Sequence, residues 1–476
     1  MTPSEKVVYG ILDFIDFCIR DFIFCVIALS VFLIPISGIY IIKGADAWVT
    51  QYIVFFFFGF LVVALRIGKY SKPLSLLAIT ALVSTVFFTG LATKALVTMV
   101  QLFISLLAIV EISRLDAKKR KILLFCLFGI TLIQCVYMTL QFFNLDPFLN
   151  WIADPTLDDT VGFSGSHNQI GIFLATTAPV MFYFCPYLIF LTAFGLWCAT
   201  TSTAWLGFVS GMLVLTKFMG KEVFQITVLI LAVFILSMFS NKNVSMHEPV
   251  REVTILSHTF RFLQRFEHFS KESYKERIML IKESIKQVES GTLRSVIDCT
   301  HDAQYVGRCD TISPHATDYE KRMAGCRNVT RKPICDEVSG HFRGYLVKDV
   351  KCNRWFGFGL GSFMSLSPLT QDTFLIKNPQ YPEMHHKYAH AHNDYVETWF
   401  ELGRLGLIAL LIIIMDIFIK FFMAIKTRKN TIIVVCFAGI VAHMVCALGV
   451  FTVQTAVTAI PLIVMLGIFY GEVRDE

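Results

Sequence analysis

Charge is scarce in this chain. Of its 476 residues, 16% are Asp, Glu, Lys or Arg, whereas 55% are hydrophobic. Soluble domains carry about 25% charged residues, and a soluble fold could not cover so much apolar surface. The composition therefore excludes an ordinary soluble protein, and the mean hydropathy of +0.62 points the same way.

A cleavable signal peptide is also missing. The N-terminal segment carries Asp13, Asp16 and Asp21 and offers no small-residue cleavage site before a long apolar run. We expect the first apolar segment to act as an uncleaved signal.

The apolar residues are gathered in long segments without charge. A helix needs about 20 such residues to cross the hydrocarbon core, whereas a transmembrane barrel shows short alternating strands. We therefore predict an all-α, polytopic membrane protein with about twelve transmembrane helices. The weakest boundaries fall at Pro186 and at residues 200–203. The expected spans cover residues 22–42, 52–67, 73–93, 95–113, 122–143, 169–185, 187–202, 204–218, 223–240, 404–424, 431–449 and 452–470.

Lys and Arg concentrate in alternate short loops. The opposite loops hold little beyond Lys43 and Lys94, and the loop 144–168 has four Asp but no Lys or Arg. Because cytoplasmic loops carry the excess of basic residues, we expect the basic loops and both termini in the cytoplasm. The basic loops contain Arg66, Lys69, Lys72, Arg114, Lys118, Lys119, Arg120, Lys121, Lys217, Lys221, Lys426, Arg428 and Lys429.

This topology divides the chain into three parts. Residues 1–240 hold nine helices, residues 241–403 form a partly helical loop domain outside the cytoplasm, and residues 404–476 hold three more helices and a cytoplasmic tail. The segment 291–351 has the character of an insertion.

Five cysteines fall within the outer loop. In an oxidising compartment they predict two disulfides and one spare thiol. Free thiols are the alternative, and a zinc site is disfavoured because no C-x-x-C pair is present. These cysteines are Cys299, Cys309, Cys326, Cys335 and Cys352.

Four histidines lie within eight residues just before the predicted helix at 404. The spacings of four residues between His386 and His390, and between His390 and Asp394, are compatible with a metal site. A solvated loop without a role is a second reading. A third is a general base, because imidazole exchanges protons near neutral pH. Asn393 or Asp394 could cap a helix that continues through Glu397 and Glu401 into the span, which would place His392 at the membrane surface. The four are His385, His386, His390 and His392.

The same region resembles a known family. His392 and Asn393, nine residues, and then Gly403-Arg404-Leu405-Gly406 match the His-Asn-x9-Gly-x-x-Gly signature of the O-antigen ligase-like (Wzy-C / WaaL) superfamily. Residues 355–363 (WFGFGLGSF) resemble its glycine-rich turn, residues 162–168 (GFSGSHN) resemble its motif before a span, and Arg277 resembles the arginine that opens a helix in its outer loop.

The resemblance implies a metal-independent glycosyltransferase of the GT-C type without a cofactor. Such enzymes act on the periplasmic face of the bacterial inner membrane and take a glycan from undecaprenyl pyrophosphate. The expected acceptor is lipid A–core; a growing glycan or a protein is the alternative within the superfamily. Membrane lipids surround such an enzyme, and no nucleic acid is involved.

The resemblance also assigns roles to residues. His392 would be catalytic and would activate the acceptor hydroxyl, either by taking its proton or by orienting the acceptor. Arg277 would bind the diphosphate, because an anionic leaving group needs arginine donors in a partly desolvated pocket. Arg265 and Arg261 could assist, or could pair with nearby glutamates at the surface. The expected supporting residues are His390, Asn393, Tyr395, Gly403, Gly406 and Asn168.

Gly403 and Gly406 would allow close packing where the helix enters the membrane. One departure from the family concerns phosphate handling: residues 201–206 (TSTAWL) lack the arginine that the family often has there. Asp416, an acid within the span 404–424, is expected to snorkel or to pair with Lys420 on the next turn.

A function of another class is transport of polysaccharide intermediates, which twelve spans would suit. Against it, the spans carry almost no buried charge for coupling ions and no internal repeat is visible.

Overall fold

The computed structural model describes part of the chain. The predicted spans 22–42 and 52–67, and nearly all of the span 73–93, lie outside the described residues. The same is true of Arg261, Arg265, Arg277, His390 and the five cysteines of the outer loop. The described residues are 92–143, 145, 162–164, 166–199, 201–220, 223, 225–230, 281–282, 284–286, 288–290, 292–298, 345–351, 353–363, 366, 391–427, 430–450, 452–453 and 455–474.

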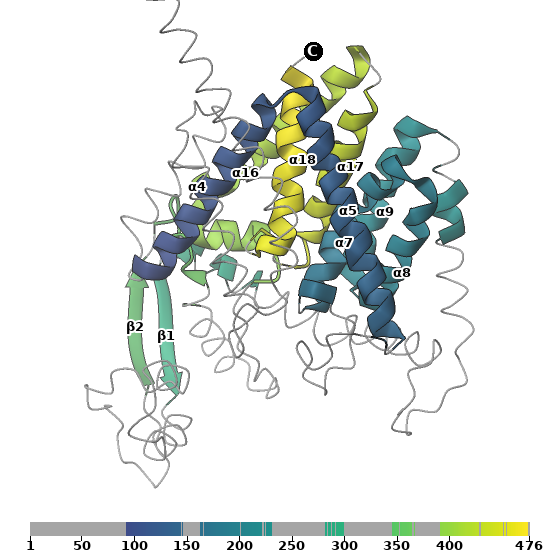
Figure 1. Ribbon diagram of the computed structural model, residues 1–476. Helices are drawn as coiled ribbons and strands as arrows, with labels where there is room; N and C mark the ends of the chain where they lie inside the picture. The colour runs from purple at the N-terminus through teal and green to yellow at the C-terminus, as the bar shows by residue number, and fades with distance from the viewer. Residues whose placement is uncertain are drawn as a thin grey trace, which may run out of the picture.

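Helices pack side by side to form the described body of the protein (Figure 1). Four of them, α5, α9, α16 and α18, are long and apolar enough to cross a membrane, and several such helices indicate a multi-pass membrane protein. The helices are α4 (Ala92–Arg114), α5 (Ala117–Phe142), α7 (His167–Phe184), α8 (Ile189–Ala199), α9 (Ser202–Met219), α16 (Asp394–Thr427), α17 (Thr431–Cys446) and α18 (Ala456–Arg474), with short 3-10 turns η1 (Gly162–Ser164) and η2 (Pro186–Leu188).

The weakest predicted boundaries are real ones. After α7 the backbone of Cys185 is extended, and Pro186 then begins η2, since proline cannot donate the hydrogen bond that would continue the helix. Between α8 and α9, Thr201 is again extended and precedes the first residue of α9. The prediction of three separate helices between residues 169 and 218 is therefore confirmed.

Small residues let the central helices approach closely. A Cβ on Gly207 of α9 would lie 2.7 Å from the carbonyl oxygen of Ala442 in α17, and one on Gly439 of α17 would lie 2.7 Å from the carbonyl oxygen of Thr176 in α7. Where lipid replaces water, helices associate through such close packing rather than through a hydrophobic driving force.

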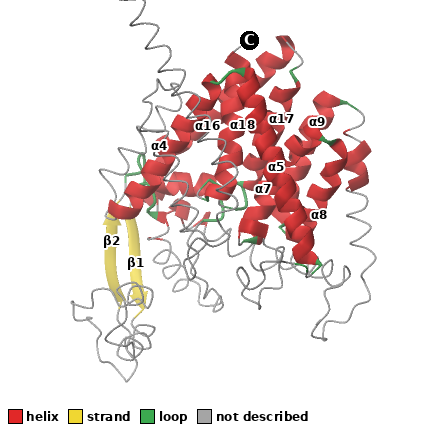
Figure 2. Cartoon of the chain, in the orientation of Figure 1, coloured by secondary structure: helices red, strands yellow, loops and turns green. Residues whose placement is uncertain are grey.

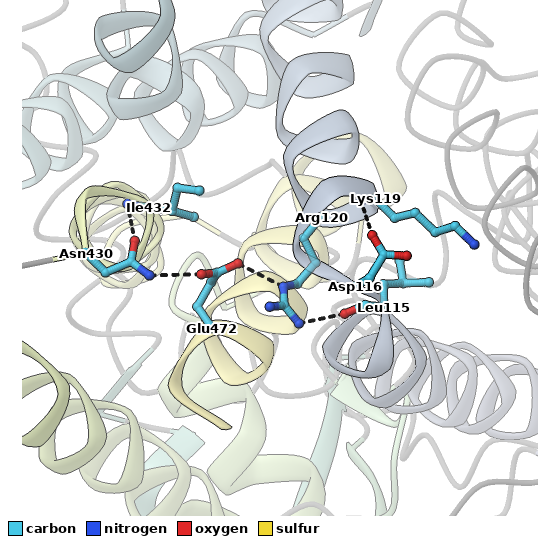
Figure 3. Close-up of polar contacts among 7 residues, drawn as sticks. All are labelled: Leu115, Asp116, Lys119, Arg120, Asn430, Ile432 and Glu472. Carbon is cyan, nitrogen blue, oxygen red and sulfur yellow. Dashed lines mark hydrogen bonds and ion pairs between the residues drawn. The ribbon is translucent and has the colours of Figure 1, made fainter. Parts of the chain in front are cut away.

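A buried ion pair joins the helices at the end of the bundle that carries the C-terminus (Figure 3). Arg120 of α5 donates through Nε to Glu472 Oε1 of α18 at 2.9 Å and through Nη1 to the Leu115 carbonyl at 2.6 Å. Asn430, the N-cap of α17, donates to Glu472 Oε2 at 2.9 Å. Near the same end Asp416 accepts from Lys420 at 2.8 Å, as the sequence predicted, and from Tyr470 at 2.9 Å.

Two strands are an exception to the all-α prediction. β1 (Thr292–Asp298) and β2 (Tyr345–Lys351) pair antiparallel, with Thr292 opposite Lys351 and Asp298 opposite Tyr345. Figure 2 shows this hairpin projecting from the end of the bundle away from the C-terminus. The strands lie at the two ends of the segment 291–351.

Candidate functional site

The loop before α16 holds His392 in an unusual backbone conformation. Among the residues that the structure describes, His392 is the one non-glycine residue with a positive φ, at 51°. For an L-residue this left-handed conformation costs about 1–2 kcal/mol and persists only where surrounding contacts enforce it.

Asn393 begins α16 directly after the histidine. Its Oδ1 accepts from the backbone N–H of Tyr395 at 3.0 Å and of Val396 at 3.1 Å, which is the geometry of an N-cap. Of the two predicted caps, Asn393 is therefore the one used. Its Nδ2 donates to the carbonyl of Leu448 at 3.0 Å, beyond the end of α17.

Two further contacts attach this loop to the end of α17. The backbone N–H of Asp394 donates to the Ala447 carbonyl at 3.0 Å, and the Tyr395 hydroxyl donates to the Met444 carbonyl at 3.0 Å. The proposed supporting residues Asn393 and Tyr395 thus position the loop by binding backbone of α17 and of the residues that follow it.

Asp394 faces inward instead of capping the helix. Its Oδ2 accepts from the Thr452 N–H at 2.7 Å, from the Thr452 hydroxyl at 2.6 Å and from the Val453 N–H at 3.3 Å. The residue lies ahead of Gly403, where the helical path breaks, and so outside the predicted span 404–424. Burial raises the pKa of Asp394 to about 7, although the bonds from Thr452 oppose this shift.

The glycine-rich turn packs against α16. Its N–H groups at Phe358 and Gly359 donate to the carbonyls of Phe400 and Glu401, at 3.0 and 2.8 Å. The N–H of Phe363 donates to the Glu401 carboxylate at 3.1 Å. Burial, with the neighbouring Glu397, also raises the pKa of Glu401 above its ordinary value. These donors are occupied by α16, so the turn serves to hold the helix.

Two glycines interlock at this contact. Gly403 has φ 65° and ψ −160°, so α16 is kinked there rather than continuous as the sequence suggested. A Cβ on Gly403 would lie 2.5 Å from the Gly357 nitrogen, and one on Gly357 would lie 2.6 Å from the Gly403 nitrogen. A Cβ on Gly406 would instead lie 2.1 Å from the Leu402 Cβ of its own helix, so its small size accommodates the kink.

Asn168 lies at the same end of the bundle. The Thr201 hydroxyl is 3.1 Å from the His167 carbonyl and 3.4 Å from Asn168 Oδ1, which places the beginnings of α7 and α9 together. The residues after α17 are close by, because a Cβ on Gly449 would lie 2.4 Å from Thr203 Cγ2. Residues 201–206 are therefore near residues 447–449, to which the loop of His392 is attached.

A charged contact borders the glycine-rich turn. Arg404 pairs with Glu289, and its guanidinium lies 5.6 Å from the centre of the Trp355 ring. Half of the Trp355 surface is exposed. No role was expected for Glu289, and Arg404 and Trp355 were expected only as parts of the His-Asn-x9-Gly-x-x-Gly signature and of the glycine-rich turn.

The burial of the acids that follow His392 was not expected from the sequence. Asp394 was considered as a helix cap or a metal ligand, and Glu397 and Glu401 only as parts of a helix, yet all three are buried. Their spacing of three and four residues was the available signal, because it places them on one helix face.

No group of three His, Cys, Asp or Glu side chains within the described ranges could hold a metal ion. His386 and His390, on which the metal alternative rests, lie outside those ranges. No protein-family model matches the chain, and no curated protein matches it.

Proposed function

We propose that this chain is a membrane glycosyltransferase that moves a glycan from undecaprenyl pyrophosphate to an acceptor, lipid A–core in the first instance. One observation carries the proposal: the histidine of the His-Asn-x9-Gly-x-x-Gly pattern is the residue held in a strained conformation at the end of the helical bundle. Strain of this kind is retained at functional sites, where a side chain must be presented in one orientation.

The reaction needs one proton acceptor and one stabilised leaving group. His392 takes the proton of the acceptor hydroxyl, whose oxygen attacks the anomeric carbon of the donor sugar. The bond between that carbon and the diphosphate oxygen breaks, and undecaprenyl pyrophosphate leaves with the electron pair. Arg277 is the candidate donor to the diphosphate, with Arg265 and Arg261 as assistants. The step requires neither metal nor cofactor.

The arrangement of basic residues supports a periplasmic site. The ends of α4, α9, α16 and α18 carry Arg114, Lys217, Lys426 and Arg474, and the buried contacts of Arg120 bring the beginning of α5 to the same side. His392 lies at the opposite end, just before the beginning of α16. With the basic end in the cytoplasm, the histidine faces the periplasm of a bacterial inner membrane.

Transfer to a growing glycan or to a protein uses the same chemistry and remains an alternative for the acceptor. Transport of lipid-linked glycans is an alternative of another class. A transporter would not require a rigidly held histidine on an outer loop, and this favours the transferase.

The test is glycan transfer by the purified protein from undecaprenyl-pyrophosphate glycan to a panel of acceptors. Wild type and His392→Ala are compared, each with and without EDTA. We expect transfer by wild type, no effect of the chelator, and loss of transfer in His392→Ala, while the productive acceptor identifies the subgroup.

Full activity of His392→Ala would remove the histidine from the mechanism. Loss of activity with chelator alone would instead favour a metal site at His386, His390 and His392. Absence of transfer to every acceptor, together with movement of labelled donor across proteoliposome membranes, would favour the transporter.

A further inference from the structure

Three carboxylates line one face of the first turns of α16. Asp394, Glu397 and Glu401 are 5%, 2% and 4% exposed. Carboxylates are rarely buried, and those that are need hydrogen-bond donors to replace the water they lose. We call these three residues the carboxylate row.

Two members of the row bind segments remote in sequence. Asp394 accepts from Thr452, just before α18, and Glu401 accepts from Phe363 of the glycine-rich turn. Both contacts attach the beginning of α16 to its surroundings.

Glu397 makes a different contact. Its Oε2 accepts the backbone N–H of Ala391 at 3.1 Å, on the residue that directly precedes His392. On the other side, the N–H of Asp394 donates to the Ala447 carbonyl at 3.0 Å. The chain is therefore anchored at the residue before the histidine, to α16 itself, and at the second residue after it, to the end of α17.

These anchors account for the left-handed backbone of His392. A residue with a side chain adopts φ 51° only when both neighbouring segments are fixed. Ala391 is fully buried, so its N–H has no access to water as a substitute acceptor if the contact with Glu397 is lost. Loss of that acceptor would release the segment and allow His392 to relax towards an ordinary conformation, which redirects the imidazole.

We infer that Glu397 is a positioning residue whose side-chain oxygen, by holding the Ala391 N–H, fixes the orientation in which His392 meets the acceptor hydroxyl. The inference rests on the proposed function of His392. Glu397 acts through the histidine and contacts neither substrate in this assignment.

The test separates the hydrogen bond from the charge. Glu397→Gln keeps an acceptor oxygen for the Ala391 N–H, whereas Glu397→Met has similar length and no such acceptor. Asp416→Asn, which changes a carboxylate in the same helix far from the loop, is the matched control. All variants are full-length protein in lipid nanodiscs, and activity is normalised to the folded fraction.

Hydrogen exchange reports the contact without any need for activity. In Glu397→Met, we expect the peptide that contains Ala391 to exchange about tenfold faster or more, since this buried N–H loses its acceptor. Glu397→Gln and Asp416→Asn should exchange as wild type does.

Transfer kinetics report the consequence for His392. In Glu397→Met, kcat should fall about 100-fold, because a small displacement of a reacting group has that effect, while KM for the acceptor changes little. Glu397→Gln should retain most of kcat and the wild-type pH profile.

Unchanged exchange and unchanged kcat in Glu397→Met would overturn the inference, and so would equal loss of kcat in Gln and Met variants that are both folded. If wild type transfers no glycan, the proposed function fails, and the exchange measurement alone then decides whether Glu397 fixes this loop.

Discussion

The ion pair between Arg120 and Glu472 should be the most sensitive polar contact in the described bundle. The Arg120 side chain is 1% exposed and that of Glu472 is 9% exposed. Removing one partner of such a pair leaves an uncompensated buried charge and costs about 3–5 kcal/mol. We therefore expect Arg120→Met and Glu472→Leu each to reduce the free energy of unfolding by about this amount.

The double variant should behave differently from the sum of its parts. Apolar residues of similar volume often replace a buried ion pair without loss of stability. Here the Leu115 carbonyl and the Asn430 amide each lose a partner as well, at about 1–3 kcal/mol for a buried group. The double variant Arg120→Met with Glu472→Leu should therefore lose less stability than the sum of the losses in the two single variants. Each single variant should also be less stable than a control variant in which a half-exposed ion pair is broken.

Lys420→Met provides that control. The Lys420 and Asp416 side chains are 37% and 24% exposed, so their pair should contribute about 1 kcal/mol or less. The assay is thermal unfolding in detergent. Unfolding is detected by a thiol-reactive label, because cysteines such as Cys436 and Cys446 are buried in the folded protein. Because unfolding of such proteins is commonly irreversible, apparent melting temperatures are compared at one heating rate. The reasoning is refuted if Arg120→Met and Lys420→Met have the same apparent melting temperature. It is also refuted if the double variant loses as much stability as the two single variants added together.

Three other changes test the site and its surroundings. Gly403→Ala should destabilise the protein far more than Gly220→Ala in a melting assay, because both glycines have positive φ but a Cβ at Gly220 meets nothing within 4 Å; equal losses would show that the clash with Gly357 is unimportant. Burial raises the pKa of Asp394 from 3.8 to about 7, so the folded state binds this proton more tightly than the unfolded state, and stability should decline as pH rises from about 4 to about 7, by at most about 4 kcal/mol. Asp394→Asn should flatten this pH dependence of the melting temperature, and an unchanged slope would assign it to other groups. Gln169→Met should raise the melting temperature, because the amide is buried with no partner in the described part of the chain and costs about 1–3 kcal/mol; a lower melting temperature would mean that the amide is used.

Helix positions in the described bundle followed from the sequence because local properties determine them. Uninterrupted apolar stretches produce α5 and α18, and Pro186 separates α7 from α8. The cap at Asn393 was predictable for the same reason, since an amide before a helical run offers an acceptor to the first free N–H groups. The pair of Asp416 and Lys420 was predictable from spacing alone.

Features that depend on distant contacts were not predictable. β1 and β2 are partners far apart in the sequence, and the sequence of either strand alone does not identify the segment with which it pairs. The kink at Gly403 exists because Gly357 lies against it, and that partner is known only once the chain is folded. The inward direction of Asp394 depends likewise on Thr452, which the sequence placed inside a span rather than before one.

The two ends of the bundle are stabilised by different chemistry, and the difference suits the proposed reaction. At the C-terminal end a cation and an anion neutralise each other, whereas at the histidine end the carboxylates of Asp394, Glu397 and Glu401 accept backbone N–H groups. Any negative charge on the carboxylate row at neutral pH would stabilise the imidazolium that forms when His392 takes a proton. The same charge would repel a diphosphate. The glycine-rich turn is not the expected phosphate site either, because its N–H groups at Phe358 and Gly359 already bind carbonyls of α16.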